Sequence, residues 1–221
     1  HYMLDTPEPG EVRRMTWTSI ARGADAFLYF RWRTCRFGAE EYWCGILDHD
    51  NIPRRRYEEI AIVGKEIRIA GPEILGTHVH IDAAVAGMDM DIEDGHAIYS
   101  CGLPAPRQMG ASAHGWLREK GYAVGVVHPE DDLSDLKLYV IPHWHMFDPE
   151  WVPALESFVK NGGVLVIGAR AHVRDLDNNV IADTPPGCLG QLAGVRVDEY
   201  GRQNRPDKRP LELMKGQKKA N

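Results

Sequence analysis

The sequence is poor in cysteine, in positive charge and in long apolar runs. Its four cysteines, Cys35, Cys44, Cys101 and Cys188, show no Cys-x-x-Cys spacing, which argues against a disulfide scaffold and a zinc site. Acidic residues outnumber basic ones and give a net charge of −6, whereas nucleic-acid binding needs a basic face. No apolar run reaches the roughly 18 residues of a membrane helix, and no secretory pattern opens the chain. We therefore expect a cytoplasmic protein without membrane or nucleic-acid partners.

From about residue 78 onward, apolar strands alternate with helices. Strands are predicted at residues 78–86, 122–127, 136–141 and 164–167, and helices at residues 108–120 and 149–160, the second entered through Asp148. This alternation implies βαβ crossovers, a parallel sheet and helices on both of its faces. The tail from residue 202 is polar and basic, with no periodicity, and is expected to be exposed.

The first 74 residues have a different pattern. A helix is predicted at residues 11–22, and the aromatic and apolar run at residues 26–32 predicts a strand buried on both faces. A second helix is predicted to begin with Pro53 just inside it and to end at Gly71-Pro72. So few residues cannot build a core of much substance. Helix, buried strand, long polar loop and helix is the local pattern of an eight-stranded α/β barrel, most of which would be missing.

Several residues of this first part carry a resemblance to a known family. Pro9-Gly10, Gly23-Ala24-Asp25 and Tyr29-Phe30-Arg31-Trp32-Arg33, followed by Glu40, Trp43 and Gly45, resemble the closing part of the catalytic barrel of family 42 glycoside hydrolases, the β-galactosidases. Residues from about 78 to 200 resemble that family's middle domain. The resemblance implies a (β/α)8 TIM-barrel end at residues 1–74, a flavodoxin-like (class I amidotransferase-like) trimerisation domain at 75–201 and a tail at 202–221.

The resemblance also implies roles for three residues. Phe30 corresponds to an aromatic residue that lines the sugar pocket, and Glu40 to a carboxylate that hydrogen-bonds sugar hydroxyls. Trp43 stands where the β-galactosidases usually have a sugar-binding His, and its ring offers a platform for a pyranose. The partners implied are a galactoside-type carbohydrate and two further copies of the chain in a homotrimer. The family's acid/base and nucleophile glutamates lie upstream, so we expect no catalytic residue in this chain.

Other readings of single motifs are weaker. Glu40 and Glu41 are neighbours on a loop, and such carboxylates rarely face one site. Arg31 and Arg33 lie on the same side of the predicted strand and are expected to pair with barrel acids. His143-Trp144-His145 has metal-ligand spacing and Asp89 begins an acidic run, but an ordinary loop at the carboxyl edge of the sheet and a solvated acidic turn are favoured.

Two rival functions stay open. One is a stand-alone oligomerisation module without enzymatic activity, in which exposed aromatic residues such as Trp116 and Trp144 cover a partner; Trp151, on a helix, is more often a core residue. The other is a small hydrolase or amidotransferase, which needs a cysteine at a strand-to-helix elbow that neither Cys101 nor Cys188 provides. Gly162-Gly163 precedes a strand, whereas a phosphate loop lies between strand and helix. We expect no cofactor and no metal.

Overall fold

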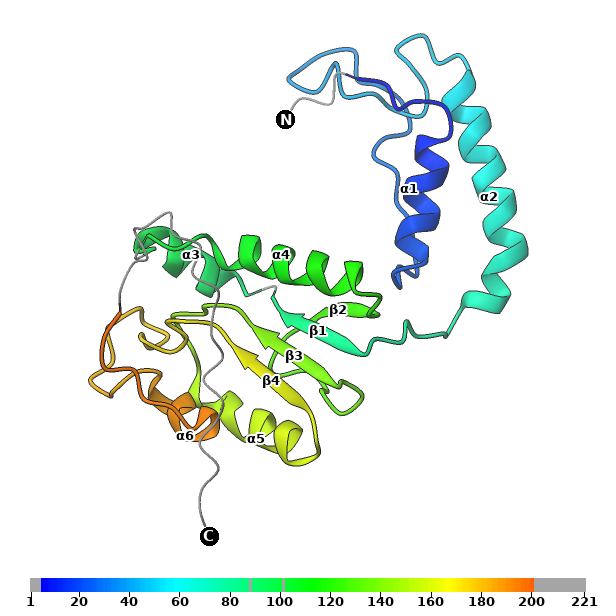
Figure 1. Ribbon diagram of the computed structural model, residues 1–221. Coiled ribbons are helices and arrows are strands. Elements are labelled where there is room, and N and C mark those ends of the chain that lie inside the picture. The colour runs from blue at the N-terminus through cyan, green and yellow to red at the C-terminus, as the bar shows by residue number, and fades with distance from the viewer. Residues whose placement is uncertain (1–4, 88, 101, 201–221) are drawn as a thin grey trace. The chain divides into compact units, whose positions relative to one another are not determined.

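The computed structural model describes residues 5–87, 89–100 and 102–200, and the chain divides after His80 into two compact units (Figure 1). Cys101 and the predicted tail at residues 202–221 lie outside the described residues. No helix in the described ranges is both long enough and apolar enough to cross a membrane.

The first unit is built on two helices that pack side by side, α1 (Glu11–Ile20) and α2 (Arg55–Ile74) (Figure 1). Glu66 of α2 joins them, because its carboxylate accepts hydrogen bonds from Arg13 Nε at 2.9 Å and from Trp17 Nε1 at 2.8 Å. These two donors hold the pKa of Glu66 below its usual range. The helix pair is therefore fixed by polar contacts as well as by its apolar stripe.

The predicted ends of the second helix are wrong. The helix begins at Arg55, two residues after Pro53, and continues through Gly71 and Pro72 to Ile74. A proline in the last turn removes only one backbone donor, and the N–H of Leu75 still donates to the carbonyl of Gly71 at 2.8 Å. Gly71-Pro72, which predicted a turn, therefore does not end the helix.

The predicted strand at residues 26–32 is not formed. The segment runs without helix or strand, and the only ladder contact at its end is an isolated parallel bridge from Arg33 to Leu47 among the described residues. Leu28 is 98% exposed, and Phe30 and Trp32 are each 61% exposed. A strand needs neighbours that share its backbone hydrogen bonds along its length, but in the described chain only Arg31 and Trp32 at its end accept such bonds, from Ile46 and Leu47.

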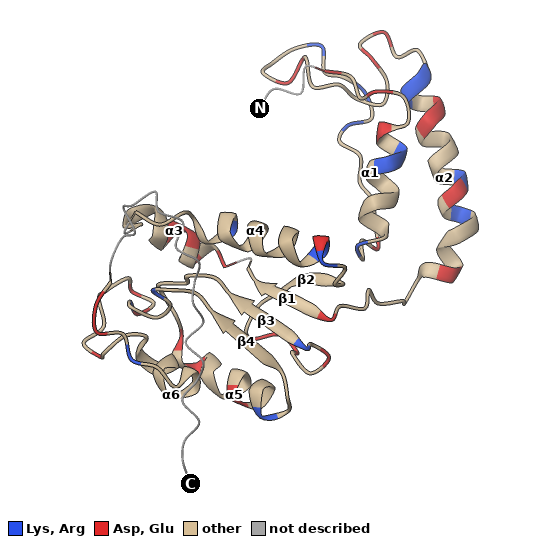
Figure 2. Cartoon of the chain, viewed as in Figure 1, with Lys and Arg blue, Asp and Glu red and all other residues tan. Residues whose placement is uncertain are grey.

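The second unit is built on one parallel sheet. Its strands are β1 (Ala83–Ala86), β2 (Val124–Val127), β3 (Leu138–Ile141) and β4 (Val164–Ile167), in the order β2-β1-β3-β4. None of them contains Lys, Arg, Asp or Glu (Figure 2). Uncharged apolar strands are what a sheet with two covered faces requires. The predicted α/β architecture is confirmed.

Helices lie on both faces of this sheet (Figure 1). They are α3 (Met90–Ile98), α4 (Pro106–Glu119), α5 (Val152–Lys160) and the short α6 (Gly190–Ala193), with 3-10 turns at Pro149–Trp151 and Gly187–Leu189. Ala83 and Val85 pack with Leu117 of α4, while Ala84 joins the larger core around Leu155 of α5 on the opposite face. Alternate residues of one strand therefore serve two cores.

Two local expectations in this unit are corrected. The acidic run from Asp89 is a helix rather than a solvated turn, because the Asp89 carboxylate caps α3 by accepting the N–H of Ile92 at 3.0 Å. Trp144 is 2% exposed and belongs to the core, not to a surface that a partner could cover. Trp151 is buried and Trp116 is 58% exposed, as expected.

Candidate functional site

The loop that carries the predicted sugar-binding residues is closed at its base by backbone hydrogen bonds. The N–H of Ile46 donates to the carbonyl of Arg31 at 2.7 Å, and the N–H of Thr34 donates to the carbonyl of Leu47 at 2.9 Å. Buried Thr34 adds a side-chain bond, since its hydroxyl accepts the N–H of Gly45 at 2.9 Å. Residues 35–44 are thus held as one loop between two fixed ends.

Gly45 is required at this closure by close packing. A Cβ at this position would lie 2.7 Å from the backbone nitrogen of Thr34 and 2.9 Å from the carbonyl oxygen of Arg31. Any other residue would push the two ends of the loop apart. In the sequence, Gly45 is only one of the residues that carry the family resemblance, and Thr34 is not among them. The sequence predicted no part in closing the loop for either residue.

The loop brings all three predicted site residues into one cluster. The rings of Phe30 and Trp43 meet edge to face, with centroids 6.1 Å apart. Arg31 Nη2 donates to Glu40 Oε2 at 2.7 Å, and the same guanidinium lies 4.6 Å from the centre of the Phe30 ring. Of the two arginines expected to pair with barrel acids, Arg31 pairs with Glu40, whereas Arg33 forms no ion pair among the described residues.

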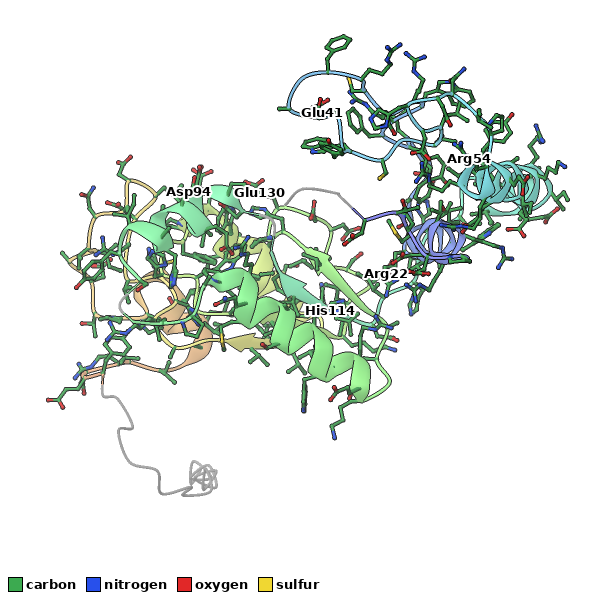
Figure 3. The ribbon with its side chains drawn as sticks, turned by 90° about the horizontal axis from the view of Figure 1, so that it is seen from above. Arg22, Glu41, Arg54, Asp94, His114 and Glu130 are labelled. Carbon is green, nitrogen blue, oxygen red and sulfur yellow. The ribbon has the colours of Figure 1, made fainter. Side chains whose placement is uncertain are left out.

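Glu41 does not join this cluster as a second carboxylate. Figure 3, in which α1 and α2 are seen end-on, shows Glu41 on the loop to one side of both helices. Its backbone carbonyl lies 2.6 Å from His49 Nε2, a contact that fixes the loop rather than a reactive group. Among the described residues, no hydrogen bond or ion pair joins the side chains of Glu40 and Glu41.

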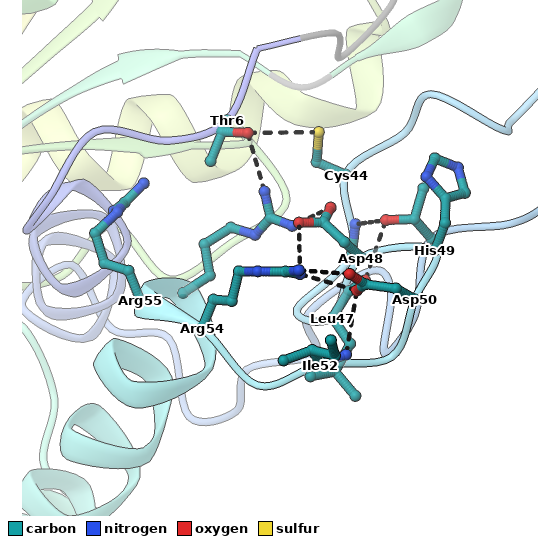
Figure 4. A network of polar contacts seen from close by, with 12 residues as sticks. Thr6, Cys44, Leu47, Asp48, His49, Asp50, Ile52, Arg54 and Arg55 are labelled. Carbon is teal, nitrogen blue, oxygen red and sulfur yellow. Dashed lines mark hydrogen bonds and ion pairs between the residues drawn. The ribbon is translucent and has the colours of Figure 1, made fainter.

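A polar network at the start of α2 anchors the far side of the loop (Figure 4). Arg56, which is 9% exposed, donates to Asp48 Oδ1 at 2.5 Å and to Thr6 Oγ1 at 2.9 Å. Arg54 forms an ion pair with Asp50, and this guanidinium and the N–H of Ile52 lower the pKa of the Asp50 carboxyl to about 2. The sequence gave no sign of the role of Arg56, because its partners lie far from it along the chain.

Beside the cluster lies an apolar cavity of 430 Å³ within the first unit. It is bounded by α1, by residues 27–30 and 44–46, and by Arg56 and Ile60 of α2. Thr16 of α1 is buried there and shares a hydrogen bond of 2.6 Å with the Tyr29 hydroxyl. The aromatic run is therefore attached to α1 by one side chain, while Leu28, its neighbour, points into solvent.

The second unit has polar side chains at the carboxyl edge of its sheet. His128, after β2, lies 3.4 Å from the Asp89 carboxylate, and its ring packs against Trp144 and Trp151. His96 of α3 is buried together with His143 and His145, which follow β3. The ring centroid of His145 lies 5.4 Å from that of His96, and the ring centroid of His143 lies 5.8 Å from it. Within the described ranges, no three His, Cys, Asp or Glu side chains are placed to hold a metal ion.

Cys188 is poorly suited to act as a nucleophile. It lies in the 3-10 turn Gly187–Leu189, and burial raises the pKa of its thiol to about 11. Its backbone N–H donates to Nδ1 of His172 at 2.9 Å, so this histidine supports the turn rather than activating the sulfur. A thiol that stays protonated at neutral pH argues against the amidotransferase reading.

Comparison with known proteins agrees with the resemblance seen in the sequence. The family model described as "Beta-galactosidase trimerisation domain" matches residues 102–220, and the model described as "Beta-galactosidase" matches residues 1–70. The chain is 31% identical over 199 residues to beta-galactosidase BgaA of Clostridium cellulovorans, covering 90% of this chain and 30% of that protein. It thus spans about three-tenths of the length of the curated relatives it matches.

Solved structures give the same result. The beta-galactosidase from the psychrophilic Marinomonas ef1 matches with a TM-score of 0.77 and 26% identity, over 88% of this chain and 30% of that one. The beta-galactosidase from Halorubrum lacusprofundi matches with a TM-score of 0.75 and 30% identity, over 88% of this chain and 29% of that one. The chain therefore belongs to the family 42 glycoside hydrolases, and its residues 102–220 belong to the trimerisation domain of that family's β-galactosidases.

Proposed function

We propose that this chain is the part of a β-galactosidase-like enzyme that closes the catalytic barrel, supplies sugar-binding residues and assembles the subunits. Residues 1–74 would form the end of the (β/α)8 barrel, residues 75–201 the trimerisation domain and residues 202–221 an exposed tail. The acid/base and nucleophile carboxylates would come from barrel segments outside this chain. The substrate would be a galactoside-type carbohydrate and the assembly a homotrimer. Cys35 and Cys188 form no disulfide within the described part of the chain, which supports a cytoplasmic setting.

The observation that carries this proposal is the segment at residues 26–32, which forms no strand and receives backbone hydrogen bonds only at its end, from Ile46 and Leu47. It is apolar and extended, it ends beside the cluster of Phe30, Glu40 and Trp43, and Leu28 within it is 98% exposed. An apolar segment of this kind is stable only when other strands cover it and receive its backbone hydrogen bonds. Barrel strands on either side would do both, and in barrels of this class the site lies at the carboxyl ends of the strands.

The chemistry of the cluster suits a sugar. Phe30 and Trp43 offer ring faces for the apolar face of a pyranose, and Glu40 offers carboxylate oxygens that accept hydrogen bonds from hydroxyl groups. The indole of Trp43 can only donate a hydrogen bond, whereas the His that usually stands here can also accept one. The sugar would therefore meet the ring of Trp43 rather than its Nε1, which is buried.

The second unit supports the assembly role. Its strand order β2-β1-β3-β4 is that of the first four strands of flavodoxin-like sheets, which supports that assignment. Val164 and Val166 of the edge strand β4 are 56% and 46% exposed, and Trp116 of α4 is exposed as well. Apolar side chains left uncovered on an edge strand and a helix are suited to burial against another subunit.

A chimera tests the barrel role. This chain would replace the matching C-terminal part of BgaA from Clostridium cellulovorans, and hydrolysis of p-nitrophenyl β-galactoside would be measured together with the oligomeric state by light scattering. We expect an active trimer, whose KM rises in the Glu40→Gln variant. The Glu58→Gln variant, changed at a position of α2 away from the cluster, is the matched control and should leave KM unchanged.

The outcomes separate the proposal from its rivals. A folded chimera without activity would contradict the barrel role and favour the stand-alone oligomerisation module. A monomeric chimera at high concentration would contradict the assembly role. Hydrolysis by this chain alone would contradict the proposal that its catalytic carboxylates come from elsewhere.

A further inference from the structure

Arg31 occupies the centre of the cluster proposed to bind the sugar. Its Nη2 donates to Glu40 Oε2 at 2.7 Å, and its guanidinium carbon lies 4.6 Å from the centre of the Phe30 ring. Phe30 in turn meets Trp43 edge to face. One side chain therefore contacts two of the three residues of the cluster and reaches the third through Phe30.

The guanidinium side of this ion pair is shielded from water, which favours a persistent geometry. The Arg31 side chain is 20% exposed and that of Glu40 is 42% exposed, so the guanidinium is shielded while part of the carboxylate remains open. A charge-assisted hydrogen bond between a planar guanidinium and a carboxylate fixes direction as well as distance. Because Oε2 is engaged, Oε1 is the oxygen best placed to accept a hydrogen bond from a ligand.

Arg31 also has an unused donor. Its Nη1 atom is buried and has no hydrogen-bond partner among the described residues, and the same holds for Nε1 of Trp43. A buried donor without an acceptor is costly, so such atoms indicate acceptors supplied from elsewhere. Barrel segments outside this chain are the natural source in the function proposed above.

Arg33 provides a contrast within the same segment. It lies two residues further on and is exposed, and its backbone forms an isolated bridge with Leu47. No ion pair of Arg33 is found among the described residues. The two arginines of the same sequence motif therefore differ in their side-chain contacts, since only Arg31 forms an ion pair among the described residues.

We infer that Arg31 is a positioning residue of the sugar pocket, one that fixes the Glu40 carboxylate and the Phe30 ring in the orientation in which they meet the sugar. The inference rests on the proposed function, since it assigns a task to Glu40 that only a sugar ligand uses. Arg31 acts through Glu40 and Phe30 and does not itself touch the reacting atoms.

The test uses the active chimera described above and p-nitrophenyl β-galactoside. Arg31→Gln is expected to lower kcat/KM on the order of 10- to 100-fold, as loss of a hydrogen bond to a charged group does, chiefly through KM. Arg31→Lys, which keeps the charge but not the planar fork, should recover part of the loss. The matched control Arg14→Gln, changed at an arginine of α1 whose side chain is 74% exposed, should alter kcat/KM less than twofold, within the scatter of surface substitutions.

A double-mutant cycle shows whether Arg31 acts through Glu40. In the Glu40→Gln background, Arg31→Gln should lower kcat/KM only by about twofold or less, because the group it orients is already lost. If the loss of kcat/KM in the double variant equalled the product of the losses in the two single variants, the inference would be overturned while the proposed function stayed intact. An inactive but folded wild-type chimera would refute the proposed function, and the inference with it.

The contact itself is tested in this chain alone, without any activity. In NMR spectra of the full chain, Glu40→Gln should shift the side-chain N–H resonance of Arg31 and leave that of Arg33 in place. An unchanged Arg31 resonance would overturn the inference even if the Arg31→Gln chimera failed to fold.

Discussion

Acid is expected to destabilise the second unit through His145. This side chain is 3% exposed, and its ring lies against that of His96, with centroids 5.4 Å apart. Burial, followed by the nearby charges of His96, Arg174 and His143, lowers the pKa of His145 from 6.5 to about 4. The fold thus favours the neutral imidazole.

The direction of the pH effect follows from proton binding. Below about pH 6.5 the unfolded chain takes up a proton on His145 that the folded chain refuses, so stability falls as the pH drops. The loss continues until the pH reaches the folded-state pKa of about 4 and is constant below it. At about 1.36 kcal/mol for each pKa unit, the full loss is at most about 3 kcal/mol, of which about 2 kcal/mol has occurred by pH 5.

The His145→Phe variant isolates this contribution. Neither ring nitrogen of His145 makes a hydrogen bond of good geometry among the described residues, so the somewhat larger phenyl ring should cost about 1 to 3 kcal/mol at pH 8, from packing alone. Between pH 8 and pH 5 the variant should lose about 2 kcal/mol less than the wild type. Urea unfolding followed by circular dichroism at several pH values measures both quantities.

His172→Phe is the matched control for removing a buried histidine. His172 is 4% exposed like His145, but its Nδ1 accepts the N–H of Cys188 at 2.9 Å. Its replacement should cost at least about 1 kcal/mol already at pH 8, because a buried donor loses its acceptor. If the wild type and His145→Phe lost the same stability on acidification, the reasoning about His145 would be refuted.

Three further predictions concern other parts of the chain. Gly45→Ala should lower the free energy of unfolding by roughly 2 kcal/mol or more, because a Cβ would meet backbone atoms at 2.7 Å. The control Gly64→Ala, which has open space around it in α2, should raise the free energy of unfolding by up to about 1 kcal/mol, and equal effects of the two variants in urea unfolding would contradict this. Cys188, with its thiol pKa raised to about 11, should react with iodoacetamide at neutral pH at least about 100-fold more slowly than a free thiol, and fast labelling in peptide maps would revive the nucleophile hypothesis. Arg56→Met should cost about 2 kcal/mol, whereas Arg14→Met, whose side chain is 74% exposed, should cost less than about 1 kcal/mol; thermal unfolding distinguishes the two.

The sequence did not predict which side chains contact each other in the tertiary structure. An acidic partner was expected for Arg31, and the structure shows that it is Glu40, nine residues away. No role was expected for Arg56, whose partner at the loop is Asp48. Trp144 offered no local sign of its burial, since it follows β3 and is covered by side chains such as Trp151 from another part of the chain. Local patterns specify periodicity, whereas partners depend on how distant segments meet.

The sequence by itself determined the alternation of strands and helices in the second unit and the helix pair of the first, because apolar periodicity and end signals act over a few residues. Asp148 at the start of the predicted helix, for example, accepts the N–H of Glu150 at 2.9 Å as a capping residue should. Only the tertiary structure decided that residues 26–32 form no strand and that Phe30, Glu40 and Trp43 meet. Backbone pairing and loop closure at Gly45 depend on neighbours in space, and no short stretch of sequence names those neighbours.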